Sequence, residues 1–496
     1  MGEHTFLTGP RASRLRGWAS AHPGLVAVAL LLLLFGGYLP TTSYDKLYFD
    51  ASQYWTLGRQ YGKTGSFELL SFASPMRGYL FPLLLMPFAV IGPHINWEPI
   101  ELMRPLGALM AALLFGALGP GLWRAVAGPG TPAVSLGRRL LFGALGFALW
   151  RDYFNFSLTD FPALIMPATG LWARLAGKNA RAAVFAGMAF GASANTRPLY
   201  IASLPFVGLL ALLPQTSATG NEKPSSPGGR RPAWGRLGAV VLGLALVLAP
   251  QAYLNLRNFG ERTPWVLARD SHYPSGIYLQ QLQWGLQYQK YETNVGHDYP
   301  RPQMFFHDPQ GAALFASTGL PRFTHTAQYL ALTRQQPVAI VAGWLRHVFN
   351  GLDIQYPSPY VTRVYVPTWP LAWLNYTVLL GGAAVLLSRW LGGRHRLRSW
   401  LVLAALLTSC AGVLPVAIEC RYLLPLHLLL LAAVALGAHP LRAWRTAGRG
   451  RRATWVVGYP ALVAAAFTAS ISAQQQLERG GRTPFSASPS PPKPSV

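Results

Sequence analysis

Two aspartates are the side chains best placed to do acid–base chemistry in this sequence. Asp50 lies in residues 49–55 (FDASQYW), a stretch that predicts the start of a helix. Asp50 and Tyr54 would share one face of that helix, because residues four apart are neighbours on a helix surface. A carboxylate beside an aromatic ring can act as general base toward a hydroxyl group. The commoner role at such a place is helix capping, and for Asp50 the pattern alone favours it.

The second aspartate, Asp160, opens another predicted helix in residues 157–162 (SLTDFP). Pro162 near the first turn supports a helix start there. Capping is again the ordinary role. A capping role does not exclude that Asp160 is also a second acid of an active site, because both roles place a carboxylate at the start of a helix.

Arginines near predicted helix ends could bind phosphate, since a guanidinium grips phosphate oxygens bidentately and keeps its charge when partly desolvated. Arg197 precedes Pro198, and Arg421 closely follows Glu419. The structural alternative for Arg421 is an ion pair with Glu419, or snorkelling toward water. Residues two apart do not share a helix face, so that pair would require a turn. Both interpretations of Arg421 remain open.

Metal and cofactor chemistry find no support in the sequence. The histidines between residues 256 and 370 lack the spacing of metal ligands. Glycines cluster in apolar stretches, where close helix packing explains them, and not in phosphate-binding loops. Cys410 and Cys420 are predicted to be buried thiols. We therefore expect no metal and no cofactor.

Composition places these residues in a membrane protein. The 496 residues are 51% hydrophobic and only 12% charged, against about 25% charged in an ordinary soluble domain. The net charge of +25 would suggest nucleic acid in a soluble protein, but the arginines stand in short tracts between apolar blocks, as orientation signals do. The blocks predict an all-α polytopic protein with about 11 transmembrane helices. They are residues 24–40, 101–123, 139–152, 161–176, 182–196, 198–214, 237–255, 371–389, 399–418, 422–438 and 454–472.

A further apolar stretch, residues 78–92, decides the topology. It is short for a span, which needs about 20 residues. If it does not cross, the N-terminus and all the basic tracts lie on the inner side, as the positive-inside rule requires. We therefore expect a re-entrant or surface-lying helix within a long first outer loop, residues 41–100. Arg77, Asp50, Asp160, Arg197 and Arg421 then all lie on the outer side.

The predicted organisation has five parts. A cytoplasmic N-terminus (1–23) precedes an N-terminal transmembrane module (24–255). A second, partly helical outer segment follows (256–370), in which residues 335–353 predict an amphipathic helix. The C-terminal spans (371–472) lead to a tail (473–496) whose end is rich in Ser and Pro and is expected to be disordered.

Four motifs together resemble the polytopic glycosyltransferases of the GT-C class, such as the protein O-mannosyltransferases of glycosyltransferase family 39 and the aminoarabinose transferases. DASQYW follows the first span, PMRGYLFP stands at the place of that class's loop helix, LTDFP opens a later span, and ECRYLLP lies near the C-terminal spans. The likeness covers roughly residues 24–440. Many members have paired acids at the first site, whereas here Ala51 follows Asp50.

The resemblance implies a site and a reaction. Asp50 would be the catalytic base and Asp160 the second acid, with a polyprenyl-phosphate-linked sugar as donor and a glycan, lipid or protein hydroxyl as acceptor. Sugar transfer would invert the anomeric carbon. Arg197 and Arg421 would hold the phosphate, and Tyr54 and Trp55 would flank the sugar. Substrate binding is expected of Tyr54, Trp55, Arg77, Arg197, Glu419, Arg421 and Tyr422.

Three other functions fit the sequence. A transporter or flippase of lipid-linked saccharides would share the spans and arginines, and a polysaccharide polymerase or ligase would use a pyrophosphate-linked oligosaccharide. A non-catalytic scaffold of envelope assembly would make Asp50 and Asp160 replaceable. The Ala-, Arg- and Gly-rich composition is associated with GC-rich bacteria, so we expect a multi-pass protein of the bacterial inner (plasma) membrane. Its active site would face the periplasm or the cell exterior.

Overall fold

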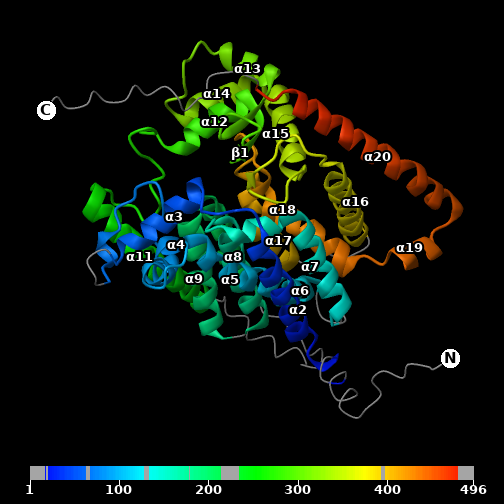
Figure 1. The fold of residues 1–496 in the computed structure, drawn as a ribbon, viewed down its shortest axis with the longest axis horizontal. Coiled ribbons are helices and arrows are strands. Elements are labelled where there is room, and N and C mark those ends of the chain that lie inside the picture. The colour runs from blue at the N-terminus through cyan, green and yellow to red at the C-terminus, as the bar shows by residue number, and fades with distance from the viewer. Residues whose placement is uncertain are drawn as a thin grey trace.

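A computed structural model describes residues 17, 20–62, 67–127, 133–177, 179–213, 234–391 and 397–478. The chain is mostly helical (Figure 1). The N-terminal helices are α2 (Pro23–Tyr38), α3 (Phe49–Gln60), α4 (Leu80–Ile91), α5 (Pro99–Leu113), α6 (Gly119–Ala127), α7 (Leu136–Trp150), α8 (Asp160–Ala176), α9 (Ala180–Thr196), α10 (Leu204–Leu212) and α11 (Trp234–Phe259). The later elements are α12 (Ile277–Gln287), β1 (Tyr288–Asn294), β2 (Gln303–His307), α13 (Pro309–Ala316), α14 (Thr326–Gln335), α15 (Pro337–Leu352), β3 (Tyr360–Val361), α16 (Trp369–Leu391), α17 (Leu397–Ala411), α18 (Leu424–Ala432), α19 (Pro440–Thr446) and α20 (Arg449–Gln475).

Six helices of the described part are long and apolar enough to cross a membrane, as expected of a helical membrane protein. They are Pro23–Thr41, Pro99–Val126, Trp234–Phe259, Trp369–Ser388, Cys420–Gly437 and Arg449–Gln475. The other predicted spans also form helices, but α8 and α9 have 17 residues each. At a rise of about 1.5 Å per residue they fall short of a hydrocarbon core about 30 Å thick. The count of about eleven crossings therefore stays a prediction.

The stretch at residues 78–92 forms the short helix α4, which packs against α3. Leu57 of α3 and Leu83 and Met86 of α4 belong to one hydrophobic cluster. Twelve residues make α4 too short to span a bilayer as a straight helix. This helix is where the sequence predicts one, and its depth in a membrane stays a prediction.

Residues 256–370, the predicted second outer segment, contain a small sheet that the all-α prediction omitted. β1 pairs with β2 antiparallel and with β3 parallel, in the order β2-β1-β3. β1 carries Lys290 and Glu292, which are buried as an ion pair 3.0 Å apart. The charges hide this strand in the sequence, because strands are usually depleted in Lys and Glu. The amphipathic helix predicted in this segment is present as α15, with Val338 and Leu345 exposed.

The C-terminal end of α20 lies beside the second outer segment (Figure 1). His307 of β2 donates its backbone N–H to the carbonyl of Gln476, 2.9 Å away, and Leu477 forms a β-bridge with Phe306. Residues 473–478, assigned to the tail from the sequence, are thus part of the folded structure. The rest of that predicted tail, and residues 214–233 of the predicted N-terminal transmembrane module, lie outside the described residues. The opposite end of α20 begins at the basic stretch Arg449–Arg452.

The topology expected from the sequence predicts which residues react from each side of the membrane. Asp45 and Gly448 are exposed, and a Cβ at Gly448 meets nothing within 4 Å. Both native thiols are buried and should stay unreactive. In intact cells a membrane-impermeant maleimide should label Asp45→Cys, and it should label Gly448→Cys only after permeabilisation. Labelling of both from the same side would contradict the topology.

Candidate functional site

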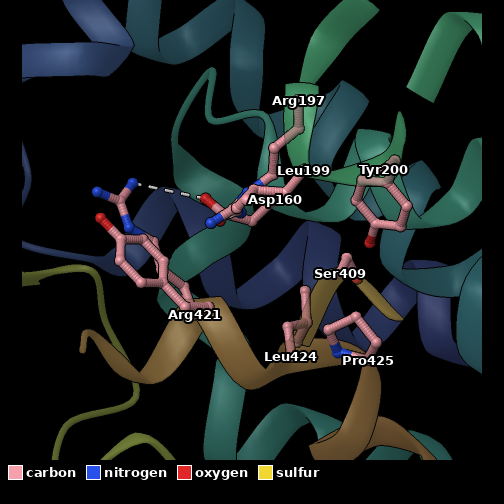
Figure 2. Close-up of a pocket in the computed structure, with 9 residues that line it drawn as sticks. Asp160, Arg197, Leu199, Tyr200, Ser409, Arg421, Leu424 and Pro425 are labelled. Carbon is pink, nitrogen blue, oxygen red and sulfur yellow. Dashed lines mark hydrogen bonds and ion pairs between the residues drawn. The ribbon is translucent and has the colours of Figure 1, made fainter. Parts of the chain in front are cut away.

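The four motifs, far apart in the sequence, meet in one cluster of charged side chains. Asp50 comes from α3 and Asp160 from α8, while Arg77 lies ahead of α4 and Arg197 ends α9. Glu419 and Arg421 stand at the 3-10 helix η7 (Cys420–Leu423). We call these six residues the charge cluster. Figure 2 shows Arg421 and Arg197 turned toward Asp160.

Asp50 is held by two arginines. Its Oδ1 accepts a hydrogen bond from Nη2 of Arg77 at 2.6 Å, and its Oδ2 lies 3.7 Å from Nη2 of Arg421. Tyr48 is the N-cap of α3 and Asp50 lies inside the first turn, so the capping interpretation is wrong. The preceding residue, Phe49, has a φ of 40°, which is rare for an aromatic residue. Such backbone strain persists only where the surroundings enforce it, and it is common at functional sites.

Arg77 is positioned by a close approach of two chain segments. A Cβ on Gly78 would lie 2.0 Å from the carbonyl oxygen of Asn195 near the end of α9, so only glycine fits there. The Arg77 guanidinium donates to Gln53 at 3.0 Å and to the Tyr54 hydroxyl at 3.2 Å. It also lies 4.9 Å from the centroid of the Tyr54 ring. Tyr54 therefore contacts the charge cluster, and its predicted place beside a sugar stays a prediction.

The neighbouring Trp55 has a different place. It is 5% exposed and belongs to the same hydrophobic core cluster as Phe81 and Leu85. Among the described residues, no hydrogen bond or cation–π contact joins Trp55 to the charge cluster. Its predicted stacking on a sugar is therefore left without support.

Asp160 is the buried acid of the charge cluster, with a side chain only 2% exposed. Its Oδ1 pairs with Arg197, and its Oδ2 lies 3.5 Å from Nη1 of Arg421. Thr159 is the N-cap of α8, and no side chain caps the helix by hydrogen bonding. The capping role is thus wrong for Asp160 as well. A buried carboxylate needs such charged partners, because an isolated ion is costly to desolvate.

Arg421 connects the whole cluster. Its Nε donates to Glu419 at 2.7 Å, so the structural pair considered from the sequence exists. A turn closed by the Tyr422 N–H and the Glu419 carbonyl, 2.9 Å apart, brings the two side chains together. The same guanidinium also approaches Asp50 and Asp160 at 3.7 and 3.5 Å. One arginine therefore faces three carboxylates.

The aromatic residue beside these charges is Tyr422. Its ring centroid lies 5.1 Å from the Arg197 guanidinium, a cation–π arrangement. Its hydroxyl hydrogen-bonds that of Tyr291 in β1. The sequence gave no signal for Tyr291, because β1 itself was not predicted. Gln53 was also missed, although it adjoins the Tyr54 that was chosen.

The cluster balances three carboxylates against three guanidiniums, which keeps the desolvated charges compensated. Burial raises the pKa of Glu419 to about 7 against the opposing effect of Arg421, and Glu419 Oε1 has no hydrogen-bond partner among the described residues. Asp50 behaves differently. Burial alone would raise its pKa, but the charges of Arg77 and Arg421 hold that pKa below its usual value.

A small cavity opens at the charge cluster, with a volume of about 240 Å³ that includes space open to solvent. Its polar walls are Asp160, Arg197, Arg421 and Tyr422. Tyr200, Ser409 and Pro425 complete the wall on the far side (Figure 2). Among the described residues, no group of three or more His, Cys, Asp or Glu side chains is arranged to hold a metal ion. The cavity instead offers guanidinium donors suited to an anion.

Comparison with known proteins adds no relative. The sequence matches no protein-family model, and the comparisons with curated proteins and with solved structures find no match.

Proposed function

We propose that this protein is a membrane glycosyltransferase that moves a sugar from a polyprenyl-phosphate donor to a hydroxyl acceptor at the outer face of the membrane. The observation that carries the proposal is the single guanidinium of Arg421 facing Asp50, Asp160 and Glu419, with Arg77 and Arg197 beside it. Ionisable residues gathered at membrane depth are functional candidates by default. The resemblance of the four motifs to the GT-C class supports the same assignment.

In the proposed reaction, the carboxylates and the guanidiniums of the charge cluster have different roles. Asp50 takes the proton of the acceptor hydroxyl as its oxygen attacks the anomeric carbon. The bond between that carbon and the phosphate oxygen breaks, and the phosphate leaves with the electron pair. Guanidiniums stabilise the charge that develops on the leaving phosphate. Attack opposite the leaving group inverts the anomeric configuration.

The ion pairs of Asp50 suggest how binding of the donor raises the basicity of Asp50. In the free protein Arg77 and Arg421 hold the pKa of Asp50 low, which makes it a weak base. A donor phosphate held by Arg197 and Arg421 competes with Asp50 for the Arg421 guanidinium, because arginine pairs with phosphate as it does with carboxylate. As the phosphate binds, Asp50 loses positive charge from its surroundings and its basicity rises. Donor binding would then precede deprotonation of the acceptor.

The class of donor that the protein accepts tests this proposal. Proteoliposomes of the full chain are incubated with polyprenyl-phosphate mannose, polyprenyl-phosphate arabinose or a polyprenyl-pyrophosphate oligosaccharide, with a membrane lipid and protein extract as acceptor. Mass spectrometry should detect released polyprenyl phosphate and a glycosylated acceptor from a monophosphate donor. Reaction of the pyrophosphate donor alone would favour a polymerase or ligase. An intact lipid-linked sugar moved across the bilayer without any transfer would indicate a transporter.

A further inference from the structure

A second opening lies between α2 and α5 and shares no wall residue with the charge-cluster cavity. It is an open groove of about 1020 Å³, counting space open to solvent. Leu32 and Gly36 line it from one face of α2, since they are four residues apart. Trp97 lines it just ahead of α5, and Leu32 and Trp97 are 38% and 51% exposed. The groove is mostly apolar and belongs to two of the helices that could cross a membrane.

One arginine interrupts this apolar surface. Arg104 donates through Nη2 to the carbonyl of Tyr44 at 2.7 Å and to the Thr42 hydroxyl at 3.4 Å. Its Nε donates to Asn155 at 3.4 Å. Within the described residues Arg104 has no carboxylate within 4 Å, unlike the arginines of the charge cluster. A guanidinium fixed by neutral groups beside a groove is well suited to a phosphate.

The same groove is also lined by a carboxylate, that of Glu101. Glu101 precedes Arg104 by three residues on α5, so the two side chains share a face of the helix and both line the groove. One oxygen of Glu101 accepts from the backbone N–H of Glu98 at 2.8 Å, which caps α5. The groove therefore offers a positive and a negative group side by side, with apolar walls adjoining them.

We propose that this groove binds one aminophospholipid of the phosphatidylethanolamine type. Its phosphate lies at Arg104, its ammonium group at Glu101, and an acyl chain runs along Leu32 and Gly36. Trp97 sits at the level of the headgroup, where tryptophan is enriched in membrane proteins. A polyprenyl phosphate would leave Glu101 without a counter-charge, which favours the zwitterionic lipid. A bilayer also presents phospholipid at exposed helices in far greater amount than any carrier lipid.

The test is lipid retention by the purified full chain. The protein is incubated in detergent with equal amounts of phosphatidylethanolamine and phosphatidylglycerol, and the bound lipid is counted by native mass spectrometry. Phosphatidylethanolamine should be preferred by up to roughly fivefold, the upper end of what one exposed ion pair contributes. Glu101→Gln should abolish the preference, because glutamine can still serve in the helix cap but carries no charge. Equal retention of both lipids by the wild-type protein would overturn the headgroup assignment.

Two further variants test the groove itself without touching Arg104. A Cβ on Gly36 meets nothing within 4 Å, so Gly36→Leu should fill the groove without disturbing the backbone and lower retention of both lipids. Gly37 has equally open surroundings but does not line the groove, so Gly37→Leu is the matched control and should bind as the wild type does. Unchanged retention in Gly36→Leu would overturn the site. So would displacement of phosphatidylethanolamine by an equal amount of polyprenyl phosphate.

Discussion

Replacing Arg421 with alanine should both destabilise the protein and weaken donor binding. Glu419 is 1% exposed and Arg421 is its ion-pair partner among the described residues, so the substitution leaves a buried carboxylate unpaired. Breaking a buried pair costs up to about 3–5 kcal/mol, and less where the carboxyl takes a proton, as Glu419 with its raised pKa should without Arg421. Loss of a charged hydrogen bond to the donor phosphate should weaken binding about 10- to 100-fold. Thermal unfolding and titration of the purified protein with polyprenyl phosphate measure the two effects.

A second variant separates the structural role of Arg421 from its role toward the donor. Arg421→Met combined with Glu419→Gln removes both charges of the pair and keeps side chains of similar volume. Replacing both partners of a buried pair is often neutral for stability. We therefore expect the double variant to regain much of the lost thermal stability and to bind donor as weakly as Arg421→Ala does. Recovery of donor affinity together with stability would assign Arg421 a purely structural role.

The sequence predicted the helices of this chain more fully than it predicted their number of crossings. Long apolar blocks such as the one within Trp234–Phe259 are unambiguous, because such a run is stable as a helix in the protein interior or in lipid. Helix length is harder to use as a criterion at α8 and α9. Their 17 residues could cross a thin bilayer or lie within the bundle. Periodicity and composition do not distinguish the two.

The site was predictable to the extent that its residues fall in motifs at helix ends. Asp50, Arg77, Asp160, Arg197, Glu419 and Arg421 were all chosen from the sequence, and the structure brings them together. The capping interpretation failed because the pattern of a cap and that of a first-turn acid differ by only one or two residues. Their side-chain partners come from distant segments, which local patterns do not encode.

The small sheet was not predictable from such patterns. Lys290 is fully buried next to Glu292, and its Nζ also approaches the Asp353 carbonyl at 3.4 Å. In a sequence, a strand with charged residues at its centre cannot be distinguished from a polar loop. Its backbone nevertheless supports the site, because the N–H of Tyr291 donates to the Ile418 carbonyl at 3.0 Å, just before Glu419. Only the tertiary structure shows that β1 holds the segment carrying Arg421.

Asp50 is the residue on which the proposed chemistry depends most. Asn at this position keeps the shape of the side chain and an oxygen that can accept from Arg77, but it cannot take a proton. General-base catalysis contributes about 10²- to 10⁴-fold to a rate, so the Asp50→Asn protein should lose most of its sugar transfer. Asp45 provides a matched control in the same loop. It is exposed, and its carboxylate accepts from the Tyr48 hydroxyl at 2.7 Å, outside the charge cluster.

The decisive measurement is the rate of sugar transfer in proteoliposomes at saturating polyprenyl-phosphate sugar, for the wild type, Asp50→Asn and Asp45→Asn. Thermal unfolding verifies beforehand that all three proteins are folded. We expect Asp45→Asn to transfer sugar at the wild-type rate and Asp50→Asn to be slower by about 10²- to 10⁴-fold. A folded Asp50→Asn protein that transfers sugar as fast as the wild type would contradict the assignment of this cluster as a catalytic site.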